Sequence, residues 1–79
     1  MKVQVLFFGA TAQETGMREI EFQLAENSKA SDALAQIVAK YPRLEKHSLL
    51  FALNQEYVGG DKIVKNGDEL AVFTAVSGG

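Results

Sequence analysis

The alternation of apolar and polar residues predicts two strands near the beginning of the chain. Residues 2–8 are dense in β-branched and aromatic side chains, which is typical of a central strand that buries much of both faces. Residues 18–24 alternate regularly and place three apolar side chains on one face: Ile20, Phe22 and Leu24. The small and polar residues 9–16 predict a loop, so we expect the two strands to pair as a hairpin.

The spacing of apolar residues then changes to three and four, which predicts one helix with one apolar face. Ser28 and Ser31 offer side-chain oxygens for its N-cap, and Pro42 forbids its continuation. The apolar positions between these limits are Ala30, Ala33, Leu34, Ile37, Val38 and Tyr41.

The second half of the chain returns to strand patterns separated by turns. We expect a strand over residues 49–53, a short one over 56–58, and a last one over 69–76. Gly59-Gly60-Asp61 and Asn66-Gly67-Asp68 are typical turn sequences.

Two strands, a helix and three further strands in so short a chain predict an α+β fold, namely the β-grasp or ubiquitin-like fold. Its mixed sheet has one main helix packed across one face. In such a sheet the last strand lies beside the first and runs parallel to it. Residues that follow the last strand would then project from a rigid central strand.

Composition narrows the range of functions. At 79 residues with 47% apolar side chains, we expect residues 1–79 to form a single domain. The net charge of −2 has both signs scattered along the chain, so neither a nucleic-acid surface nor an acidic tail is indicated. We expect no membrane span or signal peptide, and a cytoplasmic protein. Because the sequence contains no cysteine, any sulfur that it handles comes from elsewhere.

No catalytic constellation is visible in the sequence. There is one histidine, and the carboxylates do not cluster at metal-ligand spacing, so we expect no metal and no bound cofactor. His47 follows the helix together with Arg43 and Lys46, which predicts a solvated basic corner. This pattern is awkward for an independent enzyme.

The last two residues, Gly78 and Gly79, are the strongest candidates for chemistry. Glycine has no Cβ, so a flexible diglycine tail can enter a narrow channel and present the carboxylate of Gly79 as the reacting group. An ordinary small-residue chain end has the same composition. The internal pair Gly59-Gly60 has no free carboxylate and is interpreted as a turn.

Four segments together resemble the small subunits of molybdopterin synthase, which are MoaD-type sulfur carriers of the MoaD/ThiS superfamily. The resemblance covers nearly the whole chain, and the Gly-Asp-Glu turn combined with the final diglycine is its most specific element. The four segments are Val5-Leu6-Phe7-Phe8 with the following loop to Gly16, Leu53-Asn54-Gln55 with Val58, Asn66 to Ala71, and Val76-Ser77-Gly78-Gly79.

The resemblance implies a thiocarboxylate chemistry at Gly79. A ubiquitin-activator-like adenylating enzyme of the MoeB type would use ATP to convert the Gly79 carboxylate into an acyl-adenylate. A sulfur donor would then replace AMP and leave a thiocarboxylate. The loaded carrier would dock on the large synthase subunit, of the MoaE type, and two carriers in succession would convert the cyclic pyranopterin precursor into the dithiolene of molybdopterin. The working complex would be a heterotetramer.

We expect the partner interface to include aromatic side chains near the tail. One helix covers only one face of the sheet, so Phe8 or Phe73 on the other face is predicted to dock on partners, with Val76 and Ser77 in the tail itself. The chain departs from the family pattern at two places. Thr74-Ala75 stands where a proline pair is usual, and Ala12-Gln13 stands where a basic residue is common.

Three alternatives stay open at this point. A ThiS-like carrier for thiamin thiazole synthesis shares the activation chemistry, although the Leu6-Phe7-Phe8 strand and the longer loop favour the molybdopterin interpretation. A conjugation or interaction module would join Gly79 to a lysine amine. A binding domain with an incidental diglycine would tolerate removal of both glycines.

Overall fold

The computed structural model describes residues 1–75 of the chain. The order of elements is that of the predicted fold, with two short helical segments added to it. The elements are β1 (Lys2–Phe7), α1 (Ala10–Thr15), β2 (Glu19–Gln23), α2 (Ala30–Lys40), the 3₁₀ helix η1 (Pro42–Lys46), β3 (Leu49–Leu53), β4 (Glu56–Tyr57) and β5 (Glu69–Thr74).

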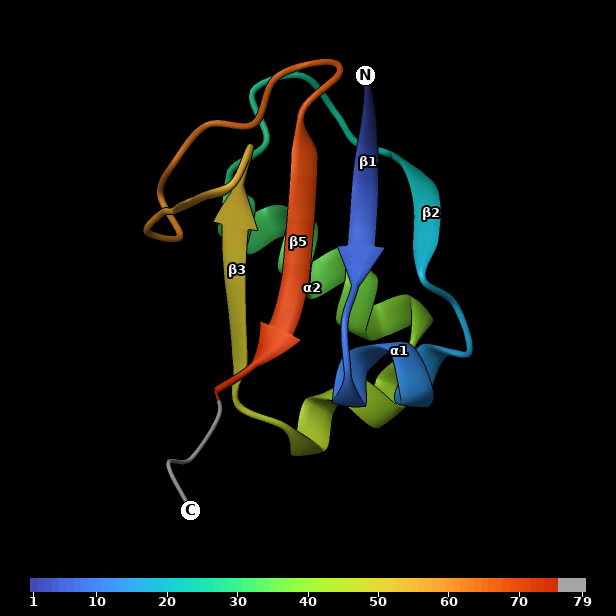
Figure 1. Cartoon of the computed structure of the whole chain (residues 1–79). Helices are drawn as coiled ribbons and strands as arrows, with labels where there is room; N and C mark the ends of the chain where they lie inside the picture. Colours follow the sequence, from blue (N-terminus) through green and yellow to red (C-terminus); the bar gives the residue numbers. More distant parts are fainter. Residues whose placement is uncertain (76–79) are drawn as a thin grey trace.

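The five strands form one mixed sheet in the order β2-β1-β5-β3-β4. β1 pairs antiparallel with β2, as the predicted hairpin requires, and parallel with β5. β5 also pairs antiparallel with β3 and is therefore the central strand (Figure 1). The expectation that the last strand lies beside the first and parallel to it is confirmed.

The hydrophobic core lies between the sheet and α2, which crosses one face of the sheet (Figure 1). Alternate residues of the two central parallel strands point into this layer, because successive side chains of a strand point to opposite faces. The apolar residues buried at this interface include Val3, Val5, Phe7, Ala33, Ile37, Leu70 and Val72. Within residues 1–75, no helix covers the opposite face of the sheet (Figure 1).

The start of α2 differs from the sequence prediction. Neither serine caps the helix, because Lys29 is the N-cap residue and the Ser28 hydroxyl donates to the Ala25 carbonyl oxygen at 2.7 Å. The side chain that protects this helix end is Asp32, whose carboxylate accepts a hydrogen bond from the Lys29 backbone N–H at 2.9 Å. A carboxylate in the first turn also favours the positive end of the helix dipole.

The loop predicted over residues 9–16 is wrong, because six of its residues form α1. The helix has no large apolar side chain, so apolar periodicity gave no signal. Its C-terminal signal is Gly16, which has φ +72° and closes the helix by donating its N–H to the Ala12 carbonyl oxygen at 2.9 Å. The segment therefore brings an ordered helix to the end of the sheet where β1 and β5 finish (Figure 1).

Gly9 connects β1 to α1 in a conformation that requires glycine. Its φ is +54° and its ψ is −120°, a combination that a side chain makes unfavourable. A Cβ built at Gly9 has no heavy atom within 4 Å, so the cost of substitution comes from the backbone alone.

We predict that Gly9→Ala lowers the free energy of unfolding by about 1–3 kcal/mol. Urea denaturation measures the change. Gly59→Ala is the control, because the backbone there is not left-handed and the added Cβ meets only the Asp61 carboxylate, 3.0 Å away. Equal stabilities of the two variants would contradict the account of Gly9.

Candidate functional site

The candidate site is the end of β5, from which the chain continues toward Gly79. On the β3 side, β5 stays paired as far as Thr74, which lies opposite Leu49. The Ala75 N–H then donates to the Ser48 carbonyl oxygen at 3.3 Å. The predicted site residues Val76, Ser77, Gly78 and Gly79 lie outside the described residues, so their assigned roles stay predictions.

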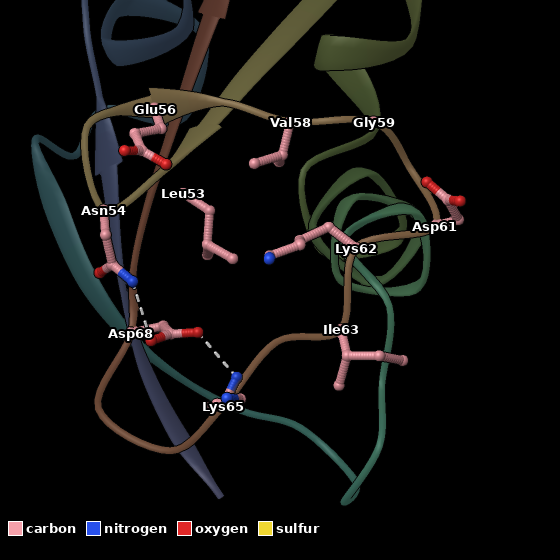
Figure 2. Close-up of a pocket in the computed structure, with 10 residues that line it drawn as sticks. All are labelled: Leu53, Asn54, Glu56, Val58, Gly59, Asp61, Lys62, Ile63, Lys65 and Asp68. Atoms are coloured by element: carbon pink, nitrogen blue, oxygen red, sulfur yellow. Dashed lines mark hydrogen bonds between the residues drawn. The ribbon is translucent and has the colours of Figure 1, made fainter.

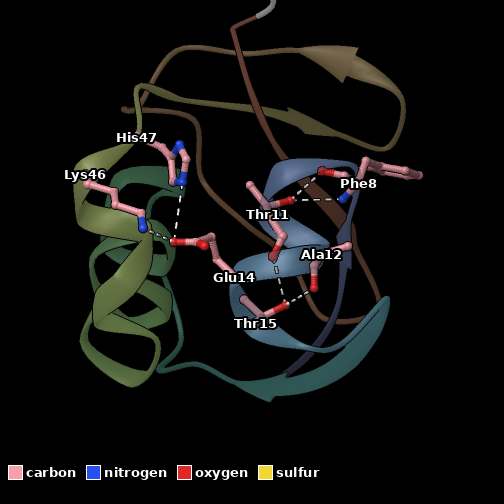
Figure 3. Close-up of polar contacts among 7 residues, drawn as sticks. All are labelled: Phe8, Thr11, Ala12, Glu14, Thr15, Lys46 and His47. Carbon is pink, nitrogen blue, oxygen red and sulfur yellow. Dashed lines mark hydrogen bonds and ion pairs between the residues drawn. The ribbon is translucent and has the colours of Figure 1, made fainter.

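The structure brings Phe8 and Phe73, the two predicted interface residues, to the same place. They line one shallow hollow of about 340 Å³ together with Gly9, Ala10 and Thr74. Phe8 is 52% exposed and points away from α1 (Figure 3), whereas Phe73 is half-buried. Phe7 and Val72, their neighbours in sequence, are buried on the opposite face. The expected division of these aromatic residues between two faces is confirmed.

Two further apolar side chains continue this surface across the sheet. Leu50 is exposed and lies opposite Phe73 in the β3–β5 pair. The ring of Tyr57 packs edge-on against the ring of Phe73 with centroids 5.8 Å apart, and Tyr57 is 77% exposed. We call Phe8, Leu50, Tyr57 and Phe73 the open-face band. Sequence analysis missed Leu50 and Tyr57, although alternation along residues 49–53 places Leu50 opposite the buried face.

A second hollow, of about 640 Å³, lies on the other side of Phe8, between α1 and β2. Its lining includes Ala12 and Gln13, the residues that stand where the family often has a basic side chain. Arg18 lines the same hollow from the segment that leads into β2. A basic side chain therefore lines the hollow beside Phe8, although it comes from a different part of the sequence and the acidic Glu19 lines the same hollow.

A third hollow, of about 750 Å³, lies at the opposite end of β5 (Figure 2). Two of its polar side chains are bonded to each other, since Asn54 Nδ2 donates to Asp68 Oδ1 at 3.0 Å, and the Lys65 backbone N–H donates to Asp68 Oδ2 at 2.7 Å. Asp68 directly precedes β5, whereas the tail follows it, so about 20 Å of strand separates this hollow from the candidate site. The hydrogen bonds to Asp68 stabilise the predicted Asn66-Gly67-Asp68 turn, and the hollow is not part of the site.

The prediction of a solvated corner around His47 is wrong. Its ring is half-buried, with Nε2 3.5 Å from Glu14 Oε2, and the Lys46 ammonium lies 2.9 Å from the same oxygen (Figure 3). The cluster joins η1 to α1. The hydrogen bond from the Lys46 ammonium is the main reason why the pKa of Glu14 lies below its ordinary value of 4.5. Burial acts in the opposite direction and only partly offsets this effect.

The lowered pKa of Glu14 predicts a specific dependence of stability on pH. Because the folded-state pKa lies below the unfolded value, the stabilisation is fully present above about pH 4.5 and is lost as pH falls through the folded-state pKa. We expect wild type to exceed Glu14→Gln in urea midpoint at neutral pH, and this difference to shrink below pH 4.5. A difference that is constant across this range would contradict the assignment.

Among residues 1–75, no group of three or more histidine, cysteine, aspartate or glutamate side chains is arranged to hold a metal ion. Within the same part of the chain, no helix combines the length and apolar character that crossing a membrane requires.

Comparison with known proteins agrees with this geometry. The model of the ThiS family matches residues 5–79. A molybdopterin synthase sulfur carrier subunit from Chlamydomonas reinhardtii is 39% identical and aligns over 100% of both chains. The human protein of the same name is 35% identical over 99% of this chain and 94% of its own.

Solved structures show the same fold. SAMP1 from Haloferax volcanii has a TM-score of 0.89 with 26% identity and full coverage of both chains. A chain of the complex between subunits 1 and 2 of the molybdopterin-converting factor from Helicobacter pylori has a TM-score of 0.71 with 22% identity, again with full coverage of both. The predicted ubiquitin-like fold and the MoaD-type resemblance are confirmed. The chain belongs to the ThiS family.

Proposed function

We propose that this chain is a sulfur carrier, the small subunit of molybdopterin synthase, and that the Gly79 carboxyl group carries the sulfur. The observation that supports this most directly is a family match that reaches Gly79, combined with a central strand β5 that leads toward this residue. Curated relatives with the name molybdopterin synthase sulfur carrier subunit favour this pathway over thiamin thiazole synthesis.

The proposed chemistry explains why the domain needs no catalytic side chains. A carboxylate resists attack by sulfur nucleophiles at neutral pH until one oxygen becomes a leaving group. Adenylation by a MoeB-type partner, with ATP, supplies that leaving group, and a sulfur donor displaces AMP to leave the thiocarboxylate. The carrier itself is non-catalytic and binds no cofactor. A chain without cysteine suits the reducing cytoplasm, where we place this reaction.

The open-face band is the proposed docking surface for the large subunit and the adenylating enzyme. Its apolar side chains lie beside the end of β5, so a partner that covers them also receives the tail. Aromatic residues are enriched in the buried centres of protein interfaces. The Helicobacter pylori structure with this fold is a complex of two subunits, which agrees with a large-subunit partner.

The sheet supports the base of the tail where the family usually has two prolines. Thr74 is paired with Leu49, and the Ala75 N–H donates to Ser48, so backbone pairing restrains these residues. Proline restricts the same positions by fixing φ. The departure at Thr74-Ala75 therefore does not weigh against the proposed function.

The function is tested by reconstitution. We expect the chain, after incubation with a MoeB-type enzyme, ATP and a sulfur donor, to convert the cyclic pyranopterin precursor to molybdopterin when a MoaE-type large subunit is added. Product is measured by its fluorescent oxidised derivative. If the loaded chain transfers sulfur only in the presence of a thiazole synthase, the pathway is thiamin synthesis and the proposal is wrong.

A second candidate is protein conjugation through Gly79. It is favoured by the likeness to small archaeal modifier protein 1 (SAMP1), since the Haloferax volcanii structure shares the fold and 26% identity. It predicts isopeptide-linked adducts between Gly79 and lysine amines. Denaturing gels of cells that express a tagged chain reveal such adducts, and their absence together with molybdopterin formation would leave the carrier function alone.

A further inference from the structure

Thr11, in the first turn of α1, is a fully buried polar residue at the end of the sheet (Figure 3). Its Oγ1 accepts a hydrogen bond from the Phe8 backbone N–H at 2.9 Å. The same oxygen lies 2.7 Å from the carbonyl oxygen of Val72, in the middle of β5 and 61 positions away in sequence. One hydroxyl group therefore connects the end of β1 to the strand that leads to the tail.

The position of this hydroxyl group corresponds to the next step of the β1–β5 ladder. At the start of the ladder the Gln4 N–H donates to the Asp68 carbonyl oxygen at 2.9 Å. In a parallel ladder this pattern advances by two residues on each strand, which brings the Phe8 N–H opposite the Val72 carbonyl oxygen. The regular pairing ends at Phe7 and Val72 because Gly9 turns the chain away. The Thr11 hydroxyl is inserted between the donor and the acceptor of the missing step.

We assign the hydroxyl hydrogen of Thr11 to the hydrogen bond with the Val72 carbonyl oxygen. A second acceptor, the Phe8 carbonyl oxygen, lies 2.9 Å from Thr11 Oγ1, but this oxygen already accepts the Thr11 backbone N–H at 3.1 Å. The contact to Val72 is the shorter of the two, and a hydroxyl group has one hydrogen to donate. The chain of hydrogen bonds thus runs from the Phe8 N–H through Thr11 Oγ1 to the Val72 carbonyl oxygen.

The hydrogen bond between Thr11 and Val72 restrains β5 on its β1 side, at the point where pairing with β1 ends. On the other side, β3 holds β5 as far as Thr74, and Ser48 accepts the Ala75 N–H. Without Thr11, the end of β5 would be held from β3 only. Phe8 of the open-face band is tied to the same hydroxyl through its backbone, so the docking surface and the tail-bearing strand share one connection.

We propose that Thr11 is a positioning residue that fixes β5 at Val72 relative to Phe8, and so aims the tail when a partner covers the open-face band. The inference rests on the proposed carrier function. Its chemical basis is that a reacting carboxylate at the end of a short tail must reach a defined point in the adenylating enzyme, and small displacements of a reacting group lower rates steeply.

Three substitutions separate positioning from stability. Thr11→Val keeps the shape of the side chain and removes the hydroxyl group, whereas Thr11→Ser keeps the hydroxyl group. Thr15→Val is the matched control in the same helix, because the Thr15 hydroxyl contacts only nearby backbone groups, such as the Thr11 carbonyl oxygen at 2.9 Å and the Met17 N–H at 3.2 Å.

The decisive readout is the steady-state rate of Gly79 adenylation, measured as pyrophosphate release while the carrier concentration is varied. We expect Thr11→Val to lower kcat by about tenfold with KM changed less than about twofold. Thr11→Ser should restore kcat, and Thr15→Val should leave both constants at wild-type values. Circular dichroism under the assay conditions confirms that each variant is folded.

A second readout does not depend on the carrier function. Hydrogen exchange of the Phe8 N–H should become faster in Thr11→Val than in Thr15→Val, because the acceptor of that N–H is removed. If Phe8 exchange is unchanged, the hydrogen-bond connection is absent and the inference fails. An unchanged kcat in Thr11→Val, a loss confined to KM, or no recovery in Thr11→Ser also overturns it. Failure of wild type to react with ATP refutes the proposed function instead, and leaves Phe8 exchange to decide on the connection.

Discussion

Adding a single alanine after Gly79 is expected to abolish sulfur loading while the domain stays fully folded. The extension moves the reacting carboxylate by about 3.5 Å. That displacement is as large as the separation of reacting atoms in a productive complex. It also places a Cβ where the diglycine has none. Thiocarboxylate formation, followed by mass spectrometry, should fall below detection, and the thermal midpoint should be unchanged.

The internal diglycine gives the matched control for this result. Gly59→Ala adds a methyl group to a diglycine that has no free carboxylate. The added Cβ meets only the Asp61 side chain. We expect this variant to load sulfur at the wild-type rate. Normal loading of the extended chain would show that activation does not require a carboxylate at the position of Gly79, and would contradict the account of the diglycine tail.

Phe73→Ala is expected to weaken binding of the large subunit by about 2–4 kcal/mol, which is about 30-fold to 1000-fold in Kd. Phe73 lies at the centre of the open-face band, between the hollow beside Phe8 and the ring of Tyr57, and opposite Leu50. Aromatic side chains at the centre of an interface carry a large share of its binding energy. Calorimetric titration with the large subunit measures the change.

The control for Phe73 is a second half-buried phenylalanine on the other face of the same sheet. Phe51 packs against the core on the α2 side and lies opposite Val72. Phe51→Ala should lower the stability of the domain more than Phe73→Ala does, and should leave the Kd of the folded protein near the wild-type value. Equal Kd values for the two variants would exclude the open-face band as the docking surface.

The sequence predicted the sheet and the main helix because their apolar residues recur with clear periods. Alternation placed Ile20 and Phe22 on the core side, and spacing of three and four placed Ala33 and Ile37 there. The parallel pairing of β1 with β5 followed from the β-grasp interpretation and is confirmed by the register of Phe7 with Val72.

The features that sequence analysis missed depend on single polar contacts, which leave no periodic pattern in the sequence. α1 contains no large apolar residue, and the hydrogen bond that joins it to β5 comes from a single threonine hydroxyl group. The N-cap of α2 was assigned to serines because serine oxygens commonly cap helices, but the Asp32 carboxylate reaches the Lys29 N–H instead. The position of Tyr57 beside Phe73 required knowing which strands are neighbours.

We propose that the sulfur travels on the carboxyl group of Gly79. The most direct measurement is the mass of the C-terminal peptide after incubation of the chain with the adenylating enzyme, ATP and a sulfur donor. The account predicts a gain equal to the replacement of one oxygen by one sulfur, located on Gly79 by fragmentation and absent when ATP is withheld. An unchanged peptide mass, or sulfur located on any other residue, would contradict it.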